Sequence, residues 1–122
     1  MYELGITRRF SAAHRLVSYE GRCEALHGHN YRVEVVVQGD TLVNGLLIDF
    51  KLLKQKVDEV IKSLDHVYLN DLEPFKKSEP SAENIAAYIY TGVVRQLGDA
   101  VRIRQVKVWE ADDTWALYRT EE

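Results

Sequence analysis

The chain has 122 residues, of which 46% are hydrophobic and 29% are charged, and its formal net charge is −3. This profile predicts one globular domain over residues 1–122 and excludes a disordered chain. The negative charge argues against a nucleic acid or an anionic membrane as partner. A single cysteine excludes an intramolecular disulfide, and no apolar run approaches 18 residues, so we expect a soluble, cytoplasmic protein.

Period-2 alternation predicts two strands in the first third of the chain. Between residues 2 and 16 most apolar side chains occupy even positions, which predicts a strand with one buried face. Because this strand exceeds the usual length, we expect a bend or bulge within it. Residues 31–38 predict a second strand, in which Tyr31 shares a face with alternate valines.

Helical spacing of apolar residues follows in two segments. Asp49 is a predicted N-cap, and the apolar residues between positions 50 and 64 recur at helical spacing. Residues 65–80 predict a loop. Ser81 is a second predicted N-cap, and the apolar stripe that follows it ends at Leu97, before Gly98.

Two further strands complete the chain. Residues 101–109 alternate but change phase, which predicts a bulge near Gln105, and residues 115–119 form a short last strand after a turn. The order is therefore β-β-α-α-β-β. It predicts an α+β fold with a four-stranded antiparallel sheet and both helices on one face.

Three histidines form the strongest candidate for a functional site. His27 and His29 are two residues apart, so in an extended segment both side chains point to the same side. Antiparallel pairing of the first two strands brings His14 beside them. Three neutral imidazoles with an open fourth position are typical of a catalytic zinc site. The competing interpretation is that each histidine is a hydrogen-bonded core residue.

Cys23 lies four residues before His27 and has three possible roles. It could be a fourth ligand, which would close the site and make the metal purely structural. It could be a thiol whose pKa is lowered by the nearby dication, which would make it a base for proton abstraction. It could also be an inert small side chain.

Two carboxylates complete the candidate chemistry. Asp65 precedes His66, and a carboxylate beside an imidazole makes a proton carrier near neutral pH, although His66 could instead simply interact with the end of the first helix. Glu110 follows Val106 and Val108 in phase, so it should face inward. It would suit a ligand with two parallel N–H donors, but the residues alone favour a salt bridge to an arginine.

Six motifs together resemble the 6-pyruvoyltetrahydropterin synthase family, which includes the bacterial 6-carboxytetrahydropterin synthases of queuosine biosynthesis. The resemblance covers nearly the whole chain. The motifs are Phe10-Ser11-Ala12-Ala13-His14, Cys23-x-x-x-His27-Gly28-His29-Asn30, Gly45-x-x-Ile48-Asp49-Phe50, Leu64-Asp65-His66-x-x-Leu69-Asn70, Pro80-Ser81-Ala82-Glu83-Asn84-Ile85-Ala86 and Val106-x-Val108-x-Glu110.

The resemblance implies a tunnelling fold (T-fold), in which subunits join into a homotrimer or homohexamer with active sites between subunits. It implies Zn²⁺ bound by His14, His27 and His29, and a catalytic triad of Cys23, Asp65 and His66. Glu110 would anchor the pterin ring, and Glu83 would lie near that pocket. The implied substrate is 7,8-dihydroneopterin triphosphate. The triphosphate-binding residues are not identified by the sequence.

The product distinguishes the branches of the family. The pattern around Cys23 and His27 most resembles enzymes that make 6-carboxy-5,6,7,8-tetrahydropterin with release of triphosphate and acetaldehyde. The 6-pyruvoyl product is the alternative, and Cys23 argues against members that make 6-hydroxymethyl-dihydropterin. A non-enzymatic zinc- or pterin-binding module is a separate hypothesis. A zinc hydrolase lacks support because the sequence has no His-Glu-x-x-His motif.

Overall fold

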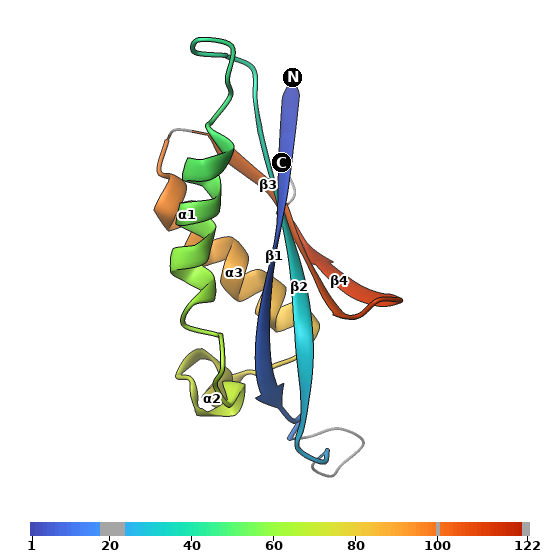
Figure 1. The fold of residues 1–122 in the computed structure, drawn as a ribbon. Coiled ribbons are helices and arrows are strands. Elements are labelled where there is room, and N and C mark those ends of the chain that lie inside the picture. Colours follow the sequence, from blue (N-terminus) through green and yellow to red (C-terminus); the bar gives the residue numbers. More distant parts are fainter. Residues whose placement is uncertain (18–23, 100, 121–122) are drawn as a thin grey trace.

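A computed structural model describes residues 1–17, 24–99 and 101–120. Figure 1 shows a sheet with helices packed on one side of it. In chain order the elements are β1 (Tyr2–His14), β2 (His27–Gly39), α1 (Phe50–Ile61), the 3₁₀ helix η1 (Leu69–Asp71), α2 (Pro74–Lys77), α3 (Ala82–Leu97), β3 (Arg102–Ala111) and β4 (Thr114–Tyr118).

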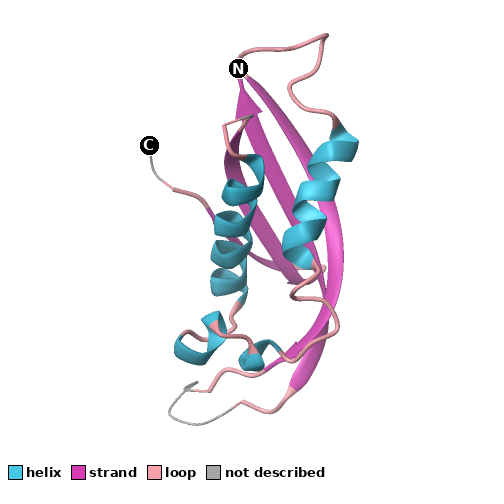
Figure 2. Ribbon diagram, turned by 90° about the vertical axis from the view of Figure 1, so that its left-hand side faces the viewer, coloured by secondary structure: helices cyan, strands magenta, loops and turns pink. Residues whose placement is uncertain are grey.

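The sheet has the spatial order β1-β2-β3-β4, and each neighbouring pair is antiparallel. Helices α1 and α3 cover the same face (Figure 2). The predicted α+β fold with a four-stranded antiparallel sheet is therefore confirmed. The core lies between this face and the two helices, and alternate residues of β2 from Tyr31 to Val37 are fully buried in it. No helix in the described part of the chain is long and apolar enough to span a membrane.

The first two strands pair over a greater length than the sequence predicts. Residues 2–14 pair with residues 39–27 in one unbroken register. Of the bend or bulge expected in the first strand, a bulge is therefore absent from this ladder. The second strand begins at His27 and not at Tyr31. The polar residues at its start hide the alternation, because this end of the strand is only partly buried.

Strand β3 contains two irregularities, and the second one bears on the site. Between the pairs Val36–Gln105 and Val37–Ile103 one residue is skipped, which confirms the bulge predicted near Gln105. The pairs Trp109–Trp115 and Ala111–Thr114 skip Glu110 in the same way. A bulge re-aims the side chain of the extra residue, and here that residue is the predicted Glu110.

The helices begin where the sequence predicts. The Asp49 carboxylate accepts a hydrogen bond from Lys51 N (2.7 Å), and Ser81 Oγ accepts one from Asn84 N (3.2 Å). Gly98 ends α3 with φ 57°, a left-handed conformation that favours glycine. The segment 65–80 is not a simple loop, because it contains η1 and α2, which are too short to produce a periodic pattern.

Candidate metal centre

The three predicted histidines converge at one end of the sheet. His14 is the last residue of β1 and pairs with His27, the first residue of β2, while His29 pairs with Ala12. One ring nitrogen from each histidine lies within 4.8 Å of the others. His14 is buried, and His27 and His29 are half-buried. The long antiparallel register of β1 and β2 is therefore what brings these side chains together.

Two of the imidazoles have their protons fixed by backbone carbonyls. His14 Nδ1 lies 2.7 Å from Pro80 O, and His27 Nδ1 lies 2.8 Å from Ala25 O. A carbonyl oxygen only accepts, so each Nδ1 must carry the hydrogen and each neutral ring presents a bare Nε2. These two Nε2 atoms are 3.0 Å apart. Two lone pairs at that distance repel one another, and a cation between them would satisfy both.

The surroundings of the third imidazole favour its neutral form. Burial lowers the pKa of His29, and His14 and His27 lower it further, while Glu110 and Glu24 oppose the shift. His29 Nε2 is buried and makes no hydrogen bond with the described residues. Metal ligands must be neutral imidazoles, so the donor set fits a divalent cation with three nitrogen ligands. This arrangement is typical of a metal site that retains a position for substrate.

Glu110 adjoins this centre from the next strand. Its Oε2 lies 3.2 Å from His29 Nε2, so the neighbour observed for this carboxylate is a histidine and not the arginine that the residues alone favour. Glu110 and Glu83 also line one open hollow of about 620 Å³ between the start of α3 and the β3–β4 hairpin, together with Trp115. Glu83 itself is exposed in the first turn of α3.

The Asp65–His66 pair lies elsewhere, on the outer edge of β1. Asp65 Oδ1 accepts a hydrogen bond from Ser11 N (3.0 Å) and lies 2.9 Å from His66 Nδ1. The N–H of His66 donates to Ser11 O (2.6 Å). His66 has φ 58°, and its side chain is 81% exposed. Since β2 pairs with the opposite edge of β1, this imidazole lies on the far side of that strand from His27 and His29.

Cys23 lies outside the described residues, so the structure gives no position for the predicted thiol. Its neighbour Glu24 is described and was not identified from the sequence. Glu24 Oε1 accepts a hydrogen bond from Leu16 N (3.1 Å) and lies 3.8 Å from His27 Nδ1. The carbonyl partners at Pro80 and Ala25 were also missed, because a backbone acceptor leaves no signal in residue type.

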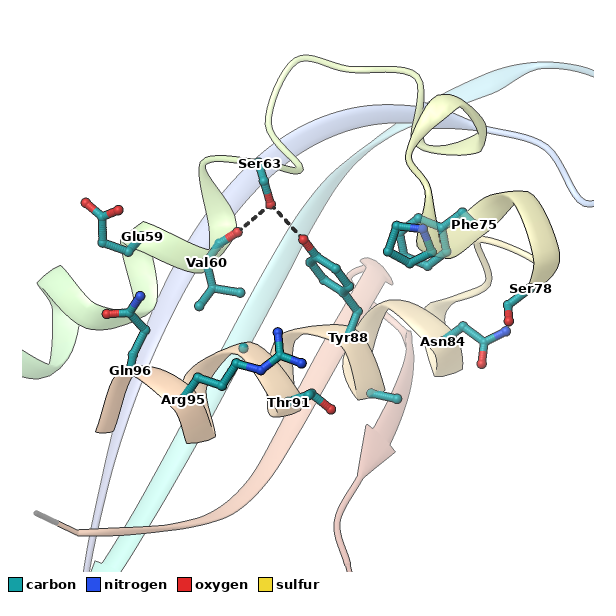
Figure 3. A pocket seen from close by; sticks show the side chains of 13 residues that line it. Glu59, Val60, Ser63, Phe75, Ser78, Asn84, Tyr88, Thr91, Arg95 and Gln96 are labelled. Carbon is teal, nitrogen blue, oxygen red and sulfur yellow. Dashed lines mark hydrogen bonds between the residues drawn. The ribbon is translucent and has the colours of Figure 1, made fainter. Parts of the chain in front are cut away.

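A second hollow of about 620 Å³ lies among α1, α2 and α3 and contains none of the predicted site residues (Figure 3). Its wall includes the hydrogen bond between Ser63 Oγ and Tyr88 OH (3.1 Å). At Gly92 a Cβ would lie 2.7 Å from a methyl group of Val60. This glycine therefore permits the close contact of α1 and α3 beside the hollow.

Comparison with known proteins identifies the family of this chain. Residues 3–121 match the family model described as 6-pyruvoyl tetrahydropterin synthase. The chain belongs to this family. It is 34% identical to the 6-carboxy-5,6,7,8-tetrahydropterin synthase of Bacillus subtilis, over 97% of this chain and 85% of that one. It is 38% identical to the dihydroneopterin monophosphate aldolase of Pyrococcus furiosus, over 85% of each chain.

A solved structure in the same family shows the same fold. The 6-pyruvoyl tetrahydropterin synthase of Caenorhabditis elegans superposes with a TM-score of 0.86 at 25% identity, over 98% of this chain and 96% of that one. The resemblance to the 6-pyruvoyltetrahydropterin synthase family and its T-fold is thus confirmed.

Proposed function

We propose that the chain is a zinc enzyme that converts 7,8-dihydroneopterin triphosphate to 6-carboxy-5,6,7,8-tetrahydropterin, with release of triphosphate and acetaldehyde. The observation that carries the proposal is the pair of bare Nε2 atoms of His14 and His27, 3.0 Å apart and beside His29. The B. subtilis relative of this name supports the choice of product. Zinc bound here supplies Lewis acidity, which acidifies C–H groups next to the side-chain oxygens of the substrate.

Side chains of the protein bind the substrate and transfer protons. Glu110 accepts hydrogen bonds from the two parallel N–H groups of the pterin ring, and the hollow that it shares with Glu83 receives the ring. The Cys23 thiolate removes a proton from the substrate side chain. The imidazole of His66, oriented by Asp65, moves a proton on the other side of the reacting carbon.

The position of His66 supports a site shared between chains. Its exposed ring lies on the outer edge of β1, away from β2. We propose a homotrimer or homohexamer in which Asp65 and His66 of one chain serve the metal centre of its neighbour. Strands β1 and β4 are the two edges of the sheet, and their pairing across subunits would join the sheets.

Product analysis tests the proposed reaction. Zinc-loaded protein is incubated with 7,8-dihydroneopterin triphosphate, and the pterins and acetaldehyde are measured by mass spectrometry. We expect 6-carboxytetrahydropterin. Accumulation of the 6-pyruvoyl product would overturn the proposed branch. The name of the C. elegans homologue supports this alternative. Cleavage of dihydroneopterin monophosphate in a parallel incubation would support the activity named for the P. furiosus relative instead.

The variant Cys23→Ala separates the enzyme from a binding module. The enzyme hypothesis expects turnover to be lost while one zinc per chain and the melting temperature are retained. Loss of zinc together with the fold would show that Cys23 closes a structural site. Glu34→Gln, which removes a carboxylate on the helix-free face of β2, is the control that should keep both turnover and zinc.

A further inference from the structure

The end of β1 that carries His14 lies at the border of the sheet. The last ladder pair joins His14 to His27, and the described residues beyond it, 15–17 and 24–26, lie outside the strands. Strand ends open more readily than strand interiors. A metal ligand at such an end needs additional support if its ring is to be held in one position.

That support comes from the segment of residues 65–70, here called the edge segment. It runs along the outer edge of β1 in parallel orientation, and Ala13 forms a parallel bridge with Tyr68. The N–H of Ala13 donates to Val67 O (3.1 Å). The same segment carries the bonds of Asp65 and His66 to Ser11.

Asn70 extends this pairing beyond the end of the strand. Its Oδ1 accepts a hydrogen bond from Arg15 N (3.1 Å), and its Nδ2 donates one to Arg15 O (2.9 Å). One carboxamide thus bonds both backbone groups of the residue after His14. With Ala13 bonded to Val67, the residues on both sides of the metal ligand are held by the edge segment.

We propose that Asn70 is a positioning residue for the metal centre, holding His14 in register through the backbone of Arg15. The proposal rests on the proposed metal function and goes beyond it, since Asn70 bonds the backbone of the residue after His14 and does not line the hollow that Glu110 and Glu83 share. With Arg15 fixed, the His14 ring can keep Nδ1 on Pro80 O and Nε2 toward His27. Loss of the two hydrogen bonds between Asn70 and Arg15 should therefore lower the affinity for the metal more than it lowers the stability of the fold.

The test uses Asn70→Ala and the milder Asn70→Ser, both uncharged, so neither changes the field at the metal. Zinc dissociation constants are measured by competition with a chromophoric chelator, and coordination is followed by the visible spectrum of the Co²⁺ protein. Since outer-shell partners of metal ligands typically contribute 10- to 100-fold in affinity and Asn70 acts one step further out, we expect an increase of about three- to tenfold in the dissociation constant. We also expect an altered Co²⁺ spectrum.

The control variant is Asp58→Ala. It removes the paired hydrogen bonds that Arg8 of β1 makes with Asp58 of α1 (2.7 and 2.8 Å), on the same strand but six residues from His14. This variant should lower the melting temperature and leave zinc affinity unchanged. If the Asn70 variants behave like this control, the positioning role is wrong. If Asn70→Ala does not fold, Asn70→Ser decides the question by the same measurements.

Failure of the proposed function would look different. If the wild-type protein binds no zinc or cobalt, the metal centre itself is wrong. If the wild-type protein binds zinc and both Asn70 variants bind it equally well, only the role of Asn70 is overturned.

Discussion

The hydroxyl group of Tyr31 is buried without a hydrogen-bond partner among the described residues. The side chain is fully buried and stacks on Phe10 with ring centroids 4.7 Å apart. Burial raises the pKa of Tyr31 strongly, and Glu110 and Glu24 raise it further. The hydroxyl therefore stays protonated and is available as a donor close to the histidines.

A buried, unpaired hydroxyl costs stability, so removing it should not destabilise the metal-free protein. We expect Tyr31→Phe to leave the free energy of unfolding unchanged or to raise it by up to about 1 kcal/mol. Chemical denaturation of the metal-free protein measures the difference. A loss of more than about 1 kcal/mol would mean that the hydroxyl is hydrogen-bonded in solution.

Asp65 links the pH dependence of stability to the edge of β1. The backbone N–H of Ser11 holds the pKa of Asp65 below its usual value, burial opposes this shift, and His66 adds to it. A carboxylate whose pKa is lower in the folded than in the unfolded state stabilises the fold above the unfolded pKa. That contribution is lost as the pH falls through the folded pKa.

The variant Asp65→Asn should therefore be less stable than the wild type at neutral pH, and the difference should shrink on acidification from about pH 6 to about pH 3. Urea denaturation across this range provides the measurement. Asp71→Asn, which removes an exposed carboxylate on η1, is the matched control. A difference between wild type and Asp65→Asn that is constant with pH would contradict this account of the Ser11 contact.

At the scale of elements, the packing of α1 on α3 depends on Gly92. Alanine at this position would gain about 1 kcal/mol in helix propensity, but its Cβ would lie 2.7 Å from Val60. We expect Gly92→Ala to lower the melting temperature in spite of the better propensity. In a double-mutant cycle with Val60→Ala, the loss should be partly relieved, whereas additive effects would show that the two residues do not compete for space.

The elements with regular periodicity were predictable, and so were their caps. The buried face of β2 between Tyr31 and Val37, the capping side chains of Asp49 and Ser81 and the stop at Gly98 follow from local rules that act within a few residues. The first four residues of β2 were missed because His27 to Asn30 include no apolar side chain and none of them is fully buried. The 3₁₀ helix and α2 were missed because each is about one turn long.

In the candidate site, too, the contacts that follow from local sequence patterns were predictable and the long-range backbone contacts were not. The convergence of His14 with His27 and His29 followed from strand alternation and antiparallel pairing. The bonds of Asp65 to Ser11 and of Asn70 to Arg15 span 54 and 55 residues and involve backbone groups. No local sequence pattern predicts such contacts, because every residue type can supply the backbone atom that makes the bond. The placement of His66 away from the other three histidines could not be read from its neighbours in sequence.

At the scale of the whole molecule, the proposal of a site shared between chains makes a quantitative prediction. Cys23→Ala and His66→Ala should each be inactive, but mixed oligomers of the two should regain activity. If each site draws Cys23 from one chain and His66 from the next, random mixing restores about a quarter of the sites. Activity is measured after the two variants are unfolded together and refolded. No recovery would mean that both residues act within one chain, and refolded single variants are the controls.

The edge segment covers only the last part of the outer edge of β1. The amides of Ser11 and Ala13 are bonded to it, so by strand alternation those of Gly5, Thr7 and Arg9 point outward on the same edge. Hydrogen exchange along this one strand should therefore report the proposed assembly. Ser11 and Ala13 should exchange slowly at every protein concentration, whereas Gly5, Thr7 and Arg9 should be protected only when a neighbouring chain lies against them.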